Sequence, residues 1–380
     1  MKVCHIITRL ILGGAQENTL LTCEGLHRRG HEVTLVTGPA IGPEGELMRR
    51  AQRGGYRLEV IDEMRREIHP ARDRATLRRL RQRLEELRPD VVHTHSSKAG
   101  ILGRAAAAKT GGCKVVHTIH GLPFHPYQRW WRNRLYIALE KWAARRTDRI
   151  LCVADAMTRQ ALAAGVGTPE QYVTVHSGME VDRFLSRPPQ ADALRASLKL
   201  PSDAVLFTQV SRIAELKGHP DILAAAPLED PRIHLCFVGD GHERLAVEKL
   251  IETGGLTGRV HLTGLLPPEQ IPAVMHATDV LIHASYREGL ARTLPQAMLA
   301  AKPVISYDVD GAPEVVTPET GVLVPTGNYA ALGKAMSTLA DDADLRRRLG
   351  SAGRELCRRR FDHERMVERI ESICRKLLNE

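Results

Sequence analysis

Two cations have the residue types and spacing best suited to chemistry. Arg212 and Lys217 follow an apolar, β-branched run over residues 204–210. A guanidinium and an ammonium five residues apart at the end of a parallel strand can converge on a diphosphate. Such a pair would stabilise the negative charge on a departing nucleoside diphosphate. A surface arginine and lysine without any ligand are the alternative.

A carboxylate in a second segment has the position of a sugar ligand. Glu288 follows the apolar run 280–284 and precedes a segment with helical spacing. Its oxygens can accept hydrogen bonds from sugar hydroxyls, and the following backbone amides can hold phosphate. Glu288 could instead cap the helix. The candidate ligand segment comprises Glu288, Gly289, Leu290, Ala291, Arg292 and Thr293.

Two further strand ends carry residues that suit ligand contacts. Gly13 and Gly14 follow the first apolar run and allow backbone N–H groups to approach an anion. They do not form a G-x-G-x-x-G pattern, so a dinucleotide cofactor is disfavoured, and a tight turn without a ligand explains them equally well. His120 lies just beyond the run 114–118, although a lone histidine is more often structural.

Bulk properties limit the classes of protein that remain. The chain has 380 residues, which exceeds one hydrophobic core and predicts two domains. Seven scattered cysteines without a C-x-x-C pair favour reduced thiols in a cytoplasm over disulfides or a zinc site. Residues 1–12 resemble a first strand more than a signal peptide, and no apolar run reaches the length of a membrane span.

The formal net charge of +9 requires an explanation. Solvated helices over residues 72–88 and 346–360 account for much of it. Only 4% of the residues are aromatic and no nucleic-acid motif is present, so nucleic acid is disfavoured as a partner. An anionic membrane surface or an anionic small substrate remains.

The chain alternates short apolar runs with helical segments, and it does so in two successive series. This pattern predicts an α/β fold of two Rossmann-like domains, each a doubly wound parallel sheet, with ligands at the carboxyl ends of the strands in a cleft between them. Proline and small polar residues over 178–200 mark the boundary. The expected strands span residues 2–8, 32–37, 90–94, 114–118, 149–153 and 172–175, then 204–210, 233–238, 260–263, 280–284, 304–306 and 321–324.

An ordered set of motifs carries a family resemblance over nearly the whole chain. It comprises Gly13-Gly14, His120-Gly121, residues 177–184, Arg212 with Lys217, Gly239-Asp240-Gly241, Glu288-Gly289-Leu290 through Pro303-Val304, and residues 321–324. In this order and spacing it resembles the GT-B retaining glycosyltransferases of family GT4. The resemblance implies an acceptor-binding domain over 1–185, a nucleotide-sugar-binding domain over 186–362, and a helix over 363–380 that packs back on the first domain.

The resemblance also assigns roles by position. Catalytic roles fall to His120, Glu288, Arg212 and Lys217: the two cations would bind the donor diphosphate, Glu288 the donor sugar, and His120 would lie beside that sugar. On the donor side it adds Gly13, Gly14, Gly264, Leu265, residues 289–293 and Gln296, and on the acceptor side Gln16, Lys98 and His120. The family's E-x7-E signature ends here in Gln296, whose amide can still bond a ribose but carries no charge. Residues 177–179 likewise read Ser-Gly-Met where the family has Asn-Gly-Val.

A narrower resemblance concerns the acceptor. Residues 93–104 and 120–125 are similar to GT4 enzymes that build lipid-linked bacterial glycans, which implies a UDP-sugar donor and a polyprenyl-diphosphate-linked acceptor. No Asp-x-Asp is placed for a metal, Asp308-Val309-Asp310 is interpreted as a loop, and the two cations substitute for one, so we expect no cofactor. A sugar-nucleotide epimerase of the same fold and an inactive sugar-nucleotide-binding protein are the alternatives.

A segment rich in tryptophan and arginine bears on location. Trp130 and Trp131 lie among Arg129, Arg132 and Arg134, a composition that suits the headgroup region of an anionic bilayer. Alternatively, Trp131, Leu135, Ile137 and Leu139 face the protein core and the cations are only solvated. We therefore expect a cytoplasmic enzyme with peripheral membrane contact through this segment.

Overall fold

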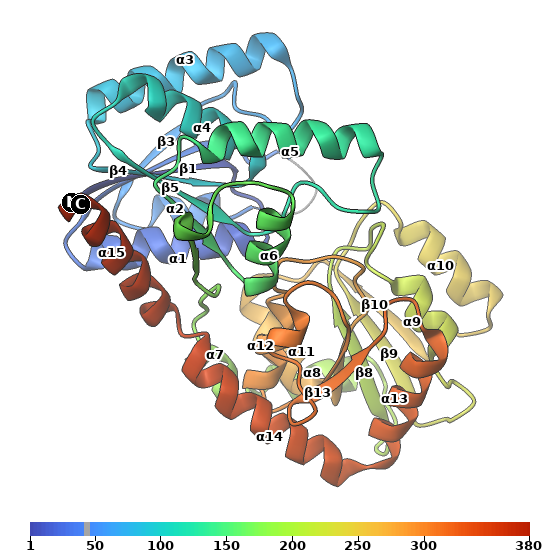
Figure 1. Cartoon of the computed structure of the whole chain (residues 1–380). Coiled ribbons are helices and arrows are strands. Elements are labelled where there is room, and N and C mark those ends of the chain that lie inside the picture. Colours follow the sequence, from blue (N-terminus) through green and yellow to red (C-terminus); the bar gives the residue numbers. More distant parts are fainter. Residues whose placement is uncertain (42–45) are drawn as a thin grey trace. The chain divides into compact units, whose positions relative to one another are not determined.

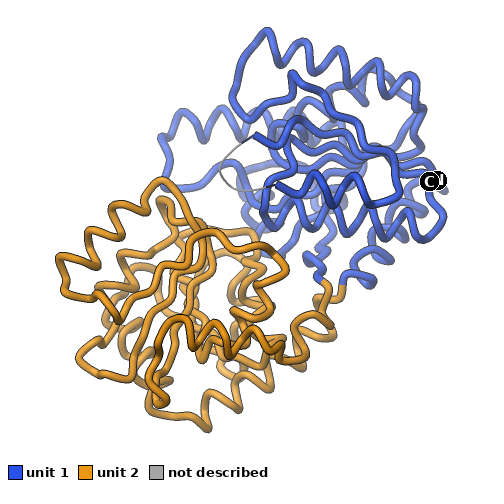
Figure 2. Tube along the Cα trace, turned by 180° about the vertical axis from the view of Figure 1, so that it is seen from behind, with its two compact units in different colours: residues 1–179, 363–380 blue, residues 180–362 orange. Residues whose placement is uncertain are grey.

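The computed structural model describes residues 1–41 and 46–380. The chain divides into two compact units (Figure 2). Unit 1 combines residues 1–179 with residues 363–380, and unit 2 comprises residues 180–362. Each unit contains one parallel sheet, so the expected α/β class with two Rossmann-like sheets is confirmed.

Unit 1 is built around a seven-stranded sheet of order β3-β2-β1-β4-β5-β6-β7. Its strands are β1 (Lys2–Arg9), β2 (Glu32–Gly38), β3 (Arg57–Val60), β4 (Val91–His95), β5 (Lys114–Ile119), β6 (Arg149–Cys152) and β7 (Tyr172–Thr174). Its helices are α1 (Gly14–Arg28), α2 (Met48–Gln52), α3 (Pro70–Leu87), α4 (Ser97–Thr110), α5 (Trp130–Ala144), α6 (Asp155–Ala163), η1 (Pro169–Gln171) and α15 (His363–Asn379).

Unit 2 contains a six-stranded sheet of order β10-β9-β8-β11-β12-β13. Its strands are β8 (Val205–Val210), β9 (Ile233–Val238), β10 (Val260–Gly264), β11 (Val280–His283), β12 (Val304–Tyr307) and β13 (Gly321–Val324). Its helices are α7 (Asp182–Leu185), α8 (Gln190–Ser197), α9 (His219–Ala225), α10 (Arg244–Thr253), η2 (Pro268–Gln270), α11 (Ile271–Ala277), α12 (Thr293–Leu299), η3 (Ala312–Glu314), α13 (Tyr329–Asp341) and α14 (Ala343–Arg360).

Strand alternation places the apolar side chains of each sheet on two faces. In unit 1, helices lie on both sides of the sheet (Figure 1). In unit 1, Val3 and Ile7 pack with α1 and α15, whereas Cys4 and Ile6 pack with α3 and α4. Burial on both faces explains why the strands read as nearly continuous apolar runs.

Both sheets have a point at which the strand order reverses. It lies between β1 and β4 in unit 1, and between β8 and β11 in unit 2. Loops that leave the carboxyl ends of such strands diverge to opposite sides and leave room for a ligand there. The residues that follow these four strands are therefore the candidates for ligand contacts.

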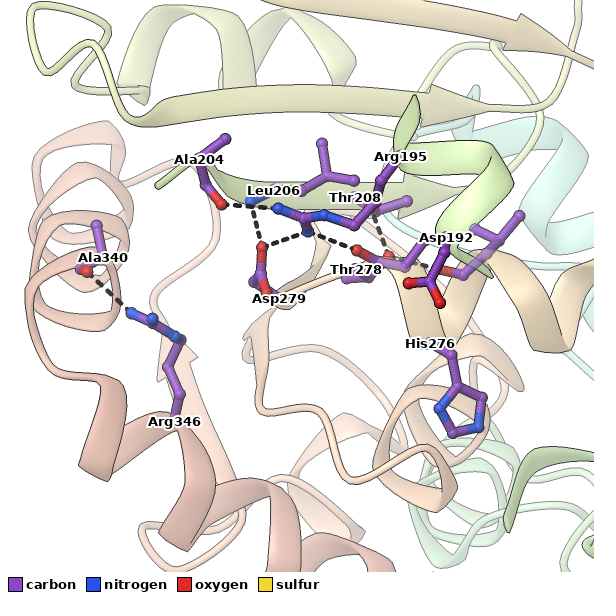
Figure 3. Close-up of polar contacts among 12 residues, drawn as sticks. Asp192, Arg195, Ala204, Leu206, Thr208, His276, Thr278, Asp279, Ala340 and Arg346 are labelled. Carbon is purple, nitrogen blue, oxygen red and sulfur yellow. Dashed lines mark hydrogen bonds and ion pairs between the residues drawn. The ribbon is translucent and has the colours of Figure 1, made fainter. Parts of the chain in front are cut away.

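Side chains fasten β8 to β11 at their amino ends (Figure 3). Arg195 of α8 donates to the carbonyl oxygens of Ala204 and Ala277 and to Asp279 Oδ2, at 2.9, 2.8 and 2.8 Å. Asp279 Oδ2 also accepts from the Leu206 N–H at 2.8 Å. Backbone pairing of the two strands is limited to residues 280–281 with 207–208, so these contacts set their spacing.

Several short elements were not expected from the sequence. The strand β3 has a partly exposed, polar sequence, Arg-Leu-Glu-Val, without an apolar run. The helix α8 lies in the proline-rich boundary region and buries Ala191 alone of its residues. The periodicity of both segments is too short to distinguish them from loops.

The last helix packs against the first. Six residues of α15 join the core that α1 shares with the sheet: Met366, Val367, Ile370, Ile373, Cys374 and Leu377. The contact is close at Gly25 of α1, where an added Cβ would lie 2.6 Å from Val367 Cγ2. Glycine at position 25 therefore makes room for the valine.

We predict that Gly25→Val destabilises unit 1. The added side chain overlaps Val367, and overpacking of this kind costs about 1–3 kcal/mol. Urea unfolding followed by circular dichroism measures the loss. Val367→Ala in the same chain removes the atoms that clash, so Gly25→Val/Val367→Ala should be more stable than Gly25→Val alone. A double variant that is less stable than Gly25→Val would contradict this packing.

Candidate functional site

The candidate donor half lies at the reversal point of the sheet in unit 2. Arg212 and Lys217 occupy the loop after β8, and Glu288 occupies the loop after β11. Lys217 Nζ forms an ion pair with Glu288 Oε1. The structure therefore brings together two of the residues expected from separate motifs, from strands that are neighbours in the sheet.

The ion pair sets the charge of the carboxylate. Burial raises the pKa of Glu288, but Lys217 and the nearby His283 outweigh it, and the net pKa lies well below its ordinary value. His283 Nε2 lies 3.5 Å from Glu288 Oε1. Glu288 is therefore anionic and can only accept hydrogen bonds. The ammonium of Lys217 has three N–H donors, of which this contact uses one.

A buried glutamine holds the two loops together. Gln209, 1% exposed, donates to the Lys217 carbonyl at 2.9 Å and accepts from the Ala284 N–H at 3.1 Å. At Gly218, with φ of 69°, a Cβ would lie 2.1 Å from the Ala284 carbonyl oxygen. Both features fix the backbone that carries Lys217 against the end of β11.

The loop after β11 is tied to the loop after β12. Asp310 Oδ2 accepts from the Glu288 N–H at 2.6 Å, and Gly289 O accepts from the Gly311 N–H at 3.0 Å. The interpretation of residues 308–310 as a loop fits this position. One of its carboxylates binds the backbone of Glu288 and thereby orients that residue.

Several buried polar side-chain atoms lie close to Glu288 in the chain and make no hydrogen bond. Within the described residues these are His283 Nδ1, Ser285 Oγ and Thr293 Oγ1. Such atoms are rare in folded proteins and gather where function requires them. The site can therefore offer hydroxyls and imidazole nitrogens, besides Glu288, to a polar ligand.

The other expected donor residues lie in the loops after β8, β10 and β11 and on α12. Leu290 and Ala291 are buried, and Arg292 leads into α12, on which Gln296 is half-buried. Arg212 is exposed. At the end of β10, Gly264 adopts φ of 73° and bridges to Gly239, and Leu265 beyond it is 44% exposed.

The candidate acceptor half lies in unit 1. His120 follows β5 and lines a cavity of about 270 Å³ together with Ala15, Ser96, Gly121 and other residues of these loops. His120 Nε2 lies 3.2 Å from His95 Nδ1. The cavity lies by the carboxyl ends of β4 and β5, next to the start of α1.

The remaining residues expected in this half have different environments. Gly13 precedes α1 and Gly14 begins it; Gln16 Oε1 lies over Gly13, where a Cβ would approach it to 2.6 Å. Lys98 forms an ion pair with Asp73 Oδ1 at 2.6 Å and donates to the Glu67 carbonyl, so it links α4 to α3. Its role in acceptor binding stays a prediction.

The structure adds residues that the sequence analysis missed. Gln209, His283 and Asp310 hold or face Glu288, and His95 contacts His120. Gln209 was recognisable as a polar residue inside an apolar strand. Their contacts depend on how the strands and loops lie in space, and spacing along the chain does not reveal them.

Comparisons with known proteins follow the division of the chain. Residues 12–183 match the model of Glycosyltransferase Family 4, and residues 190–356 match that of Glycosyl transferases group 1. A 2-deoxystreptamine glucosyltransferase of Streptomyces kanamyceticus is 32% identical over 70% of this chain and 71% of its own. A 2-deoxystreptamine N-acetyl-D-glucosaminyltransferase of Streptomyces fradiae is 29% identical over 94% of this chain and 91% of its own.

Two further similarities extend over nearly all of the chain. The UDP-Gal:alpha-D-GlcNAc-diphosphoundecaprenol alpha-1,3-galactosyltransferase of Escherichia coli is 27% identical over 91% of this chain and 89% of its own. A crystal structure of Anabaena HepE with UDP and glucose superposes with a TM-score of 0.85, at 21% identity, over 98% of this chain and 99% of that one. The chain belongs to the family 4 glycosyltransferases and has their GT-B fold.

We predict that Lys217→Met and Arg212→Ala each lower kcat/KM for sugar transfer. Loss of a charged contact to the leaving diphosphate removes about 2–4 kcal/mol of transition-state stabilisation, which corresponds to roughly 30- to 1000-fold in rate. Steady-state kinetics of the purified variants measures the loss. Lys334→Met, which removes an exposed ammonium on α13, is the matched control and should leave kcat/KM unchanged. Near-normal turnover of both site variants would contradict a donor site at these loops.

Proposed function

We propose that the chain transfers a sugar, with retention of its anomeric configuration, from a UDP-sugar to a polyprenyl-diphosphate-linked glycan in cell-surface polysaccharide synthesis. The observation that carries the donor half is the pairing of Lys217 with Glu288 at the reversal point of the unit 2 sheet. One cation and one anion there match two adjoining parts of a nucleotide sugar, its diphosphate and its hydroxyl-bearing sugar ring.

The reaction follows from these parts. The bond between the anomeric carbon and the diphosphate oxygen breaks, while Arg212 and Lys217 stabilise the charge on the leaving group. The acceptor hydroxyl attacks from the same face, and its proton passes to the departing diphosphate oxygen. Glu288 fixes the sugar through its hydroxyls, and Gln296 bonds the ribose through its amide. The cations take the place of a metal ion in this scheme.

The proposed acceptor is supported by the names of the relatives and by one surface of unit 1. The Escherichia coli relative is named for a diphosphoundecaprenol acceptor, whereas the two Streptomyces relatives are named for 2-deoxystreptamine. A lipid-linked acceptor requires the enzyme to work at a membrane surface. The exposed face of α5 favours that acceptor.

Apolar side chains are exposed along α5. Trp130, Trp131, Leu135 and Trp142 are 68%, 45%, 46% and 38% exposed. The alternative interpretation, in which Trp131 and Leu135 face the core, is therefore wrong for these two residues. Trp131, Leu135 and Trp142 follow one another at i, i+4 and i+11, which places them on one side of the helix. The three tryptophans are the only ones in the chain.

The charge of this face is positive. Arg132, Arg134 and Arg146 lie over the rings of the three tryptophans, 4.0–5.2 Å from the ring centroids. Glu140, the one acidic residue of α5, points inward and forms a buried ion pair with Arg104 at 2.7 Å. A face of exposed tryptophans and uncompensated cations suits the headgroup region of an anionic bilayer. None of the described helices has the length and apolarity to span a membrane.

The proposed reaction is tested by a panel of donors and acceptors. Purified protein is incubated with UDP-, GDP- and ADP-sugars and either a short-chain polyprenyl-diphosphate glycan or 2-deoxystreptamine, and product is measured by mass spectrometry. We expect transfer from a UDP-sugar to the lipid-linked acceptor, undiminished by EDTA. Transfer to 2-deoxystreptamine alone would overturn the acceptor assignment. Complete inhibition by EDTA, restored by Mg²⁺ or Mn²⁺, would overturn the metal-free reaction.

We predict that Arg132→Glu/Arg134→Glu weakens binding to anionic vesicles. Each basic residue near such a surface contributes about 1 kcal/mol, so loss of two lowers the partition coefficient at least about 30-fold. Co-sedimentation with phosphatidylglycerol vesicles, and with phosphatidylcholine vesicles for comparison, measures it. Trp130→Ser/Trp131→Ser should also weaken binding, whereas Leu245→Ser, at a residue 78% exposed on α10, should not. Binding to neither kind of vesicle, or unchanged binding of both α5 variants, would refute membrane contact through α5.

A further inference from the structure

Three buried histidines lie where the strand order of unit 1 reverses. His5 is on β1, and His93 and His95 are on β4. The β1–β4 register pairs His5 with His93, and the two-residue period of a strand places His95 on the same face. All three are fully buried, in a sheet whose other positions are mainly apolar. Packing of the sheet alone does not require imidazoles at these positions.

The histidines form a hydrogen-bonded series that ends at the cavity. His5 Nδ1 lies 3.1 Å from His95 Nε2, and His95 Nδ1 lies 3.2 Å from His120 Nε2. The rings of each pair are inclined by only 17° and 26°, so they lie nearly coplanar and edge to edge, as an N–H···N bond requires. His120 lines the cavity at the ends of β4 and β5. Its Nε2 is therefore directed toward His95.

The series fixes more than the angle of the ring. A neutral imidazole carries one proton, and an N–H···N bond requires a protonated nitrogen on one side only. The direction of the His5–His95 bond therefore sets that of the His95–His120 bond. The direction of the latter sets which nitrogen of His120 carries its proton.

Two other roles fit the cluster less well. The imidazole nitrogens of His5, His93 and His95 are close enough to hold a metal ion, but the group contains no anionic residue. A doubly charged ion there would be buried without compensation. Proton conduction would end on His5, and burial lowers the pKa of His5 to about 3, so that residue does not accept the charge.

We propose that His95, whose other ring nitrogen is held by His5, is a positioning residue that fixes the ring orientation and the tautomer of His120 at the cavity. The kinetic part of this inference rests on the proposed sugar transfer, because His120 is expected to lie beside the transferred sugar. The structural part, the ordering of His120, does not depend on it.

A pair of amide substitutions separates the two bonds of His95. The side-chain amide of asparagine reaches about as far as imidazole Nδ1, and that of glutamine about as far as Nε2. His95→Asn therefore retains a partner for His120, and His95→Gln retains a partner for His5 only. We expect His95→Gln to lower kcat about 10- to 100-fold with little change in KM, as loss of a residue that orients a reacting group does. His95→Asn should retain most of kcat.

Two controls exclude a merely structural effect. His93 is equally buried on the same strand, but its Nε2 contacts Thr118 Oγ1 at 2.7 Å and not His120. His93→Gln should therefore leave kcat nearly unchanged. In a His120→Ala chain, His95→Gln should cause no further loss of kcat, because its effect passes through His120. Equal losses from His95→Gln and His95→Asn, or a full additional loss in the His120→Ala chain, would overturn the proposal.

A measurement on the unaltered protein does not require activity. Long-range ¹H–¹⁵N spectra of protein labelled in histidine report the tautomer of each neutral ring, and His120→Gln assigns the signal. We expect one tautomer for His120 in the wild type and averaged nitrogen shifts in His95→Gln. Averaged shifts in the wild type, or one zinc ion per chain by elemental analysis, would overturn the inference. If the tautomer is fixed but no donor is used, the proposed function fails and the ordering of His120 stands.

Discussion

The tie between β8 and β11 is the constraint on which the candidate donor site depends. These strands lie side by side, but their connections run to opposite sides of the sheet. Their shared backbone pairing is short, so side chains maintain their spacing, Arg195 with Asp279 at one end and Gln209 at the other. Because the two loops are held in this way, Lys217 and Glu288 remain in contact. No flexible segment has to become ordered when a ligand binds.

In unit 1, different residues hold the two diverging strands, β1 and β4, together. Thr8 of β1 and Ser96 after β4 share a hydrogen bond of 2.8 Å, and Thr8 Oγ1 also accepts from the Ala99 N–H at the start of α4. The three histidines lie on the same two strands, further from the carboxyl ends. Polar groups thus join the diverging strands of both sheets, where apolar contacts alone would leave the loops free to shift.

The fold followed from the sequence because parallel strands buried on both faces read as apolar runs with helices between them. The single charged residues of the site were recognisable for a similar reason, since Arg212, Lys217 and Glu288 come directly after such runs. The contacts made by Gln209, His283, Asp310 and His95 were not, because they depend on how the strands and loops are placed in space. The exposure of Trp131 and Leu135 was equally hidden, because an apolar stripe has the same spacing whether it packs inward or faces water.

The position of α15 in the core of unit 1, after all of unit 2 in the chain, affects how the protein can fold during synthesis. Unit 2 is inserted in unit 1, whose first and last residues lie side by side (Figures 1 and 2). The core around α1 lacks six of its apolar side chains until the final helix has left the ribosome. Unit 2, although it is synthesised later than most of unit 1, is contiguous and can complete its core first. Unit 2 can therefore fold before unit 1 is complete, because α1 keeps an uncovered apolar face until α15 is available to pack on it.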